Sequence, residues 1–119
     1  MSLYKPGLTD NVKVPSDVVR HRFIAHNGSY ATGGGGVRGV SKDGANAGEK
    51  VTLFVNGSCQ LELEEAVTLG AEIMAGTTGK GKIATNSGTL PLGTFVSAIA
   101  LEAGSIGETI EVRLVNYKI

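Results

Sequence analysis

The chain has 119 residues, the length of one ordinary domain, and carries 11 Lys and Arg against 11 Asp and Glu. A formal net charge of zero argues against a nucleic-acid binder, because such proteins depend on an excess of positive charge. No apolar stretch approaches the roughly 20 residues of a transmembrane helix, and the single cysteine, Cys59, cannot form an intrachain disulfide.

The N-terminal residues are predicted to be extended. Residues 1–11 contain Pro6, Gly7 and Asp10 and show little apolar periodicity. We expect this segment to be an extended N-terminal arm that a partner orders, and residues 12–119 to form a single β domain. The start of the sequence lacks the apolar core of a signal peptide, so we expect a soluble protein made in the cytoplasm.

The first part of the domain is predicted to contain short strands. Val12 and Val14 alternate with polar residues before a turn at residues 15–17. Residues 18–25 are a candidate strand, and residues 37–40 form a second short one.

Glycines mark two connections between these strands. Asn27 and Gly28 are a strong hairpin signal, because both residues tolerate positive φ. The run Gly33–Gly36 loses much backbone entropy when it is ordered. This loop is therefore predicted to be either mobile or held by a neighbouring segment.

Two stretches of the chain, residues 47–56 and 106–115, repeat one pattern. Each has Gly-Glu near its start and then alternating apolar residues. These are Val51, Leu53 and Val55 in the first stretch and Ile110, Val112 and Leu114 in the second. Alternation with period two predicts a strand with one buried face.

A second echo links residues 12–25 with residues 61–74, which share a similar layout of apolar and polar positions. Together the two echoes predict two similar halves of about sixty residues, an arrangement compatible with one closed barrel. Such a Gly-rich, repeated strand pattern is typical of a scaffold that binds or assembles.

The second half is predicted to open with a half-buried strand, because Cys59, Leu61 and Leu63 alternate with polar residues. Residues 65–72 favour one helical turn at most, since Gly70 weakens it.

The rest of the second half is predicted to be a hairpin, a loop and a strand. Residues 76–82 form the hairpin tip, residues 86–93 the loop and residues 95–101 the strand. One face of that strand carries Phe95, Ser97, Ile99 and Leu101.

Turn signals recur every 8–12 residues or so, which is typical of a sandwich or barrel. The sequence therefore predicts an all-β fold: a small antiparallel barrel or sandwich with a two-fold internal pseudo-repeat and an extended N-terminal arm.

One motif nearly matches a phosphate-binding P-loop. Residues 76–83 have its glycine and lysine spacing, but Ile83 stands where a magnesium-binding hydroxyl is required, and no helix is expected to follow. We interpret the motif as a plain hairpin tip. Lys80 between glycines is also reminiscent of biotinyl or lipoyl carrier domains, but the flanking signature of those domains is absent.

Other reactive residue types are isolated. His21 and His26 lie five apart on a predicted strand and turn, so surface or interface positions are favoured over a metal site. Cys59 fits a small core residue better than a nucleophile. Glu62, Glu64 and Glu65 favour a solvated face over an acid/base pair, although a neighbouring subunit's Arg or Lys would also suit them.

Taken together, several segments resemble the phage capsid cement (head decoration) proteins. Tyr4-Lys5-Pro6-Gly7 is similar to the aromatic-x-Pro-Gly opening of that family, and residues 37–40 with residues 47–57 are similar to its glycine- and valine-rich middle. Residues 66–73 and residues 107–114 resemble a later segment and a closing strand that ends in Val-Arg-Leu.

The resemblance implies a non-enzymatic virion protein that binds the outside of the assembled capsid and stabilises it. It implies the major capsid protein as partner, self-association with a trimer favoured, and synthesis in the host cytoplasm. We expect no cofactor, no metal, no membrane and no direct nucleic-acid contact. Tyr4, Lys5, Pro6 and Gly7 are the candidate capsid contacts.

An alternative is a carbohydrate- or receptor-binding module of a phage tail or fibre. The chain has only six Tyr and Phe residues and no Trp, which disfavours stacking on sugars. A small hydrolase would need a catalytic constellation that the sequence does not offer.

Overall fold

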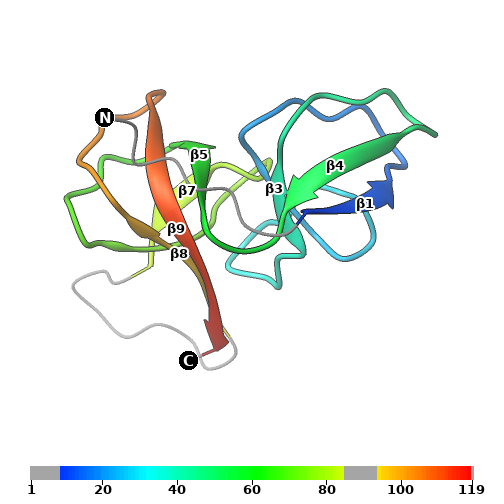
Figure 1. Ribbon diagram of the computed structural model, residues 1–119. Helices are drawn as coiled ribbons and strands as arrows, with labels where there is room; N and C mark the ends of the chain where they lie inside the picture. The colour runs from blue at the N-terminus through cyan, green and yellow to red at the C-terminus, as the bar shows by residue number, and fades with distance from the viewer. Residues whose placement is uncertain (1–8, 85–93, 119) are drawn as a thin grey trace.

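The computed structural model describes residues 9–84 and 94–118, and within them it contains nine strands and no helix. The first sheet has the order β1-β4-β3-β2, and the second has the order β5-β9-β8-β6-β7. Each named pairing is antiparallel, which confirms the all-β prediction. Figure 1 shows the two sheets as two lobes, with β1, β3 and β4 in one and β5, β7, β8 and β9 in the other.

The strands of the first sheet are β1 (Thr9–Lys13), β2 (Phe23–Ile24), β3 (Gly39–Ser41) and β4 (Lys50–Phe54). Those of the second are β5 (Ser58–Glu62), β6 (Glu72–Ala75), β7 (Gly81–Ile83), β8 (Phe95–Ala100) and β9 (Thr109–Lys118).

The two sheets are built alike, which confirms the internal repeat. Strands β1, β4, β3 and β2 occupy the same order as β5, β9, β8 and β6. The register also matches, because Val12 pairs with Val51 in the first sheet and Leu61 with Ile110 in the second. Since each repeated strand finds its partner within its own half, the halves form two sheets and not one common barrel.

The repeated Gly-Glu signal forms the same turn in both halves. Gly48 and Gly107 have φ of 87° and 84°, a region that favours glycine. The carboxylate after each glycine accepts a hydrogen bond from the start of its own turn: Glu49 from the Asn46 N–H at 2.8 Å, and Glu108 from the Ser105 N–H at 2.7 Å. The glycine supplies the backbone shape and the glutamate holds the turn closed.

Each half has an apolar core in equivalent positions. In the first half it consists of Val12, Val14, Val18, Ile24, Val51 and Leu53. The equivalent buried residues of the second half are Leu61, Leu63, Val67, Ile73, Ile110 and Val112. Burial of these branched side chains supplies the main driving force for folding in both sheets.

The halves are joined by a row of apolar residues on the first sheet. Phe23 lies opposite Val40, and Val40 lies opposite Phe54. All three are buried in the same cluster as the core of the second half. This shared cluster holds one sheet against the other.

The four-glycine run is held by the second half, so the second of its two predicted states is the one observed. The Gly33 N–H donates to the Gly76 carbonyl at 2.9 Å, and the Gly34 N–H to the Ala75 carbonyl at 2.7 Å. The Phe95 N–H donates to the Gly34 carbonyl. A Cβ on Gly34 would lie 2.9 Å from Thr94 Cγ2, so the close approach requires glycine.

Two predicted elements differ from the structure. The strand expected over residues 18–25 is reduced to β2, because the backbone turns at His21, which has φ of 65°. No helical turn forms over residues 65–72, where Gly70 has φ of 83°.

The strand predicted over residues 95–101 is present as β8, and its core face is the one opposite Phe95 and Ile99. Val96, Ala98 and Ala100 point into the core, whereas Phe95 and Ile99 are only partly buried. An irregularity between Val96 and Ala98 also turns the polar Ser97 inward. The predicted loop at residues 86–93 lies outside the described residues, as do residues 1–8 of the predicted arm, while residues 9–11 belong to β1.

Candidate functional site

The most concentrated group of charges lies where the two halves meet. Arg22 reaches Glu62 at 3.2 Å, and Lys80 reaches the other oxygen of the same carboxylate at 3.5 Å. The Arg22 guanidinium also donates to the Thr78 carbonyl at 3.1 Å and lies 5.5 Å from the centre of the Tyr30 ring. The Arg22 side chain is only 14% exposed, so this network acts as a tie between the halves.

The acidic run at the end of β5 and just after it is also used for holding loops, which corrects the prediction of a solvated face. Glu64 accepts hydrogen bonds from the Thr77 N–H at 2.6 Å and the Thr77 hydroxyl at 2.9 Å. Glu65 accepts from the Ile83 N–H at 3.0 Å. Each carboxylate has a partner within its own chain, and their arrangement does not form an acid/base pair.

The P-loop-like segment is a hairpin tip, as predicted. It connects β6 to β7, and Ile83 belongs to β7 instead of starting a helix. The Gly79 N–H donates to the Ala31 carbonyl, and the Gly79 carbonyl accepts from the Phe23 N–H at 2.7 Å. These backbone groups dock the tip onto the first half, so they are not presented to a phosphate. Lys80 is likewise engaged with Glu62.

Cys59 is an inert core residue. Its side chain is fully buried, and burial raises the pKa of the thiol to about 12, with the negative charge of Glu111 adding to the effect. A thiol with this pKa is almost entirely protonated at neutral pH and is a poor nucleophile. The interpretation of Cys59 as a small core residue is therefore confirmed.

The two histidines do not assemble a metal site. Within the described ranges no group of three His, Cys, Asp or Glu side chains could hold a metal ion. Burial lowers the pKa of His21, with the nearby charge of Arg20 adding to the effect, so the imidazole favours its neutral form. The His26 carbonyl accepts a hydrogen bond from Arg38 at 3.2 Å.

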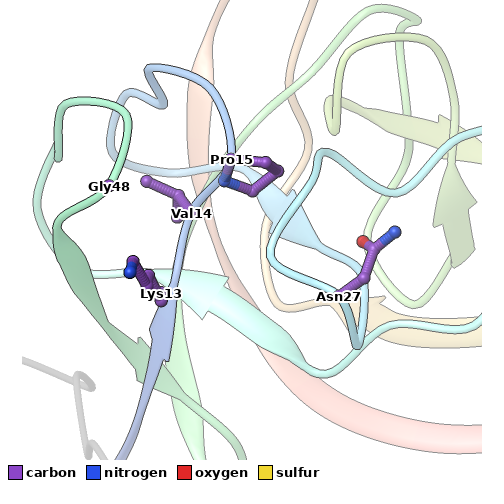
Figure 2. A pocket seen from close by; sticks show the side chains of 5 residues that line it. All are labelled: Lys13, Val14, Pro15, Asn27 and Gly48. Carbon is purple, nitrogen blue, oxygen red and sulfur yellow. The ribbon is translucent and has the colours of Figure 1, made fainter.

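A pocket of about 340 Å³ opens beside β1 in the first half. Figure 2 shows Lys13, Val14 and Pro15 along the chain as it leaves β1, with Asn27 on the turn across from them and Gly48 on the neighbouring turn. Its lining contains a single charged group and no pair of residues suited to acid/base or nucleophilic chemistry.

The second half is closed where this pocket is open. There Leu63 forms a bridge with Gly81, and the Glu64 N–H donates to the Gly81 carbonyl at 2.9 Å. Pro15 occupies the position equivalent to Glu64 and has no N–H to donate. The pocket therefore lies beside a residue that cannot make the backbone bond found in the second half.

The Arg38 side chain links β1 to the turn after β2 in the first half. It donates to Asp10 at 2.8 Å, to the Asn11 carbonyl at 3.3 Å and to the His26 carbonyl. The hydrogen bond from Arg38, followed by one from the Asn11 N–H, holds the pKa of the Asp10 carboxyl below its usual value.

Two large apolar side chains are prominent on the surface of the second half. Leu69 is 70% exposed and Ile106 is 72% exposed. Each follows by two residues one member of the bridge between Val67 and Gly104. Sequence reasoning missed both, because an isolated apolar residue in a turn carries no signal of exposure.

The candidate contact residues Tyr4, Lys5, Pro6 and Gly7 lie outside the described residues. A search of the described ranges for a helix long and apolar enough to cross a membrane finds none.

Comparison with known proteins adds two findings. A family model for phage cement protein matches residues 4–114. The fold is similar to the crystal structure of the head fiber gp8.5 N base in bacteriophage phi29, with a TM-score of 0.73 and 16% identity over 94% of this chain and 97% of that one. At this identity the likeness shows the fold alone. No curated protein matches the chain.

Proposed function

Because the chain belongs to the phage cement protein family, we propose that it binds the outside of the assembled capsid and stabilises it. The family makes it a structural, virion-associated phage protein. The proposed partner is the major capsid protein, and the proposed assembly is a homo-oligomer, with a trimer favoured. The observation that carries the proposal is the family match, which spans nearly the whole chain.

The use of charged residues supports a structural role over an enzymatic one. Arg22, Glu62 and Lys80 tie the halves together, and Glu64 and Glu65 hold the hairpin. In the part of the chain that the structure describes, these groups are occupied in maintaining the fold. We therefore assign no catalytic activity.

The physical basis of stabilisation is linkage. A protein that binds only the mature shell lowers the free energy of that shell by mass action, and this opposes the pressure of packaged DNA. Many copies on one lattice add the effect of multivalency when each copy spans more than one capsid subunit.

We propose two groups of capsid contacts. The first is Tyr4, Lys5, Pro6 and Gly7, which precede β1 and would pair with a capsid strand edge by β-augmentation. The second is Leu69 with Ile106, whose exposed side chains lie on turns flanking one bridge and would bury apolar surface on docking.

The test is binding to purified expanded capsids of the matching phage, measured as copies bound per shell and as the temperature at which shells break. The wild-type protein should bind and raise that temperature. The variant L69S/I106S should bind more weakly, whereas V19S, which changes an exposed apolar residue of the first half, should bind normally. A wild-type protein that neither binds nor protects shells would disprove the proposal.

The carbohydrate-binding alternative is weaker, because the aromatic residues of the described core are occupied. Phe23 and Phe54 are buried, and Tyr30 contacts Arg22 and accepts a hydrogen bond from the Val19 N–H. Binding on a glycan array would favour this alternative.

A further inference from the structure

The zero net charge conceals an opposition between the two halves. Residues 1–57 carry seven Lys and Arg against four Asp and Glu, a net charge of +3. Residues 58–119 carry four against seven, a net charge of −3. Since the halves share one fold, the difference lies in the outward-facing side chains.

The positive charge gathers on the outer face of the first sheet. Lys13 lies directly opposite Lys50, and the Lys42 N–H donates to the carbonyl of Thr52, two residues farther along β4. These positions share one face, because residues 50 and 52 alternate with the buried Val51. We call Lys13, Lys42 and Lys50 the lysine face.

The lysine face is exposed, and no ion pair found in the described residues involves it. All three side chains are exposed, and the ion pairs found in the described residues involve Arg22, Arg38 and Lys80 instead. Like charges directly opposite each other on neighbouring strands destabilise a sheet. An external negative surface would remove this repulsion.

The equivalent face of the second sheet has Glu62, Leu101 and Thr109 where the first sheet has its lysines, and it carries Arg113 as well as carboxylates. Glu62 replaces Lys13, and Glu111 replaces Thr52, as the matching registers show. Glu102 lies beside Glu111, since its Oε2 accepts the Glu111 N–H at 2.9 Å. We call Glu102 and Glu111 the glutamate face.

The glutamate face has an unused acceptor. Glu111 Oε2 is buried and has no hydrogen-bond partner among the described residues. A buried carboxylate oxygen without a donor is unfavourable, and a positive charge brought close to the Glu111 carboxylate would offset this cost even though the atom itself is covered by its own chain. An ammonium group supplies three donors and a positive charge.

We propose that the lysine face of one copy docks on the glutamate face of a second copy, head to tail. The same pairing of signs already operates within the chain, where Arg22 of the first half binds Glu62 of the second. The opposite and equal charges of the halves make a second copy the best-matched partner, and a neutral chain does not repel itself at long range. A contact between two different faces produces a ring if the rotation closes.

This inference deepens the self-association in the proposed function and is tested without capsids, so its failure leaves capsid binding untouched. Light scattering of the purified protein at low salt should give a mass above one chain that falls as salt screens the charges. The variant K50E should weaken self-association roughly tenfold or more. The matched variant R20E has the same change in net charge at another exposed cation of the first half and should associate like the wild type.

A mixing experiment tests the pairing of the faces. The variants K13E/K42E/K50E and E102K/E111K should each be monomeric, and thermal melting checks that each is folded. Mixed together they should associate in equal amounts, because the reversed faces match each other. Since only alternating copies can pair, any closed ring that the mixture forms should contain an even number of chains.

Three outcomes would overturn the proposal. A wild-type protein that is monomeric at low salt has no such contact. Folded face variants that keep the wild-type mass show that another surface joins the copies. Variants that keep this mass but lose binding to capsids assign the lysine face to the capsid.

Discussion

The two halves share a strand order and a register but differ in one row of side chains. In the first half the row is Phe23, Val40 and Phe54, and it is buried against the second half. The equivalent row of the second half is Glu72, Ile99 and Arg113, and none of these is fully buried. At this place on the sheet the same framework thus presents an apolar row in one half and a row with two charged residues in the other.

This difference explains why the chain contains two halves that are not interchangeable. An apolar row requires a covering partner, and the second half provides it. A charged row at the equivalent place does not attract a further half in the same way, much as the terminal units of repeat proteins carry a polar outer face.

The hairpins of the two halves differ for a related reason. In the first half Ala25 bonds to Ser29, whereas in the second Met74 pairs with Lys82, so the connecting loop is four residues longer. The longer tip carries Gly79 to the first half, where it bonds to Phe23 and Ala31. The asymmetry at the junction therefore comes from both halves.

The largest expected effect comes from removing a member of the apolar row. Phe23→Ala should lower the free energy of unfolding by about 3–5 kcal/mol, because it leaves a cavity in a fully buried site. Ile99→Ala, at the partly buried equivalent of Val40, should cost much less. Urea unfolding of both variants measures the difference, and similar losses would show that the two rows are equivalent.

The junction network should have the next largest effect. Arg22→Met should cost about 1.5–3 kcal/mol, because it removes hydrogen bonds between a largely buried guanidinium and both Glu62 and Thr78. Arg38→Met in the first half should cost less, because the Arg38 and Asp10 side chains are more exposed. A double-mutant cycle of Arg22→Met with Glu62→Gln isolates the pair; zero coupling would show that the network does not tie the halves.

The features predictable from sequence were those set by near neighbours along the chain. The two Gly-Glu turns could be predicted, because the glycine with positive φ and the carboxylate that closes the turn lie within four residues. The pairs are Gly48 with Glu49 and Gly107 with Glu108. The alternation of Cys59, Leu61 and Leu63 predicted their burial for the same reason.

The features that sequence reasoning missed depend on distant partners. Glu62 appeared solvated because Arg22, its partner, is 40 residues away. The opening at Pro15 becomes visible only when the two halves are aligned through their hydrogen bonds. The opposed faces were hidden by the neutral total charge, since that number does not show where charges lie.

A smaller effect tests whether the repeated turns are equivalent. Gly48→Ala and Gly107→Ala should each cost about 1–2 kcal/mol, because alanine is strained at positive φ and neither site has a steric clash. Equal losses of stability, measured by thermal unfolding, would show that the two turns are equivalent in energy as well as in geometry. A loss confined to one variant would show that one turn relaxes while the other cannot.

The smallest effect concerns His21, whose equivalent in the second half is Gly70; both have positive φ. Because burial lowers the pKa of the folded imidazole, the unfolded chain binds more protons at pH values near and below 6.5. His21 thus contributes stability that is present above the unfolded pKa and is lost as the pH falls through the folded pKa.

In His21→Gly this contribution should vanish, since the residue then matches Gly70. Urea unfolding from pH 7.5 to about pH 5 measures the two slopes. Parallel curves for the wild type and the variant would mean that the imidazole is equally solvated in both states, and that the two halves differ here in sequence but not in linkage.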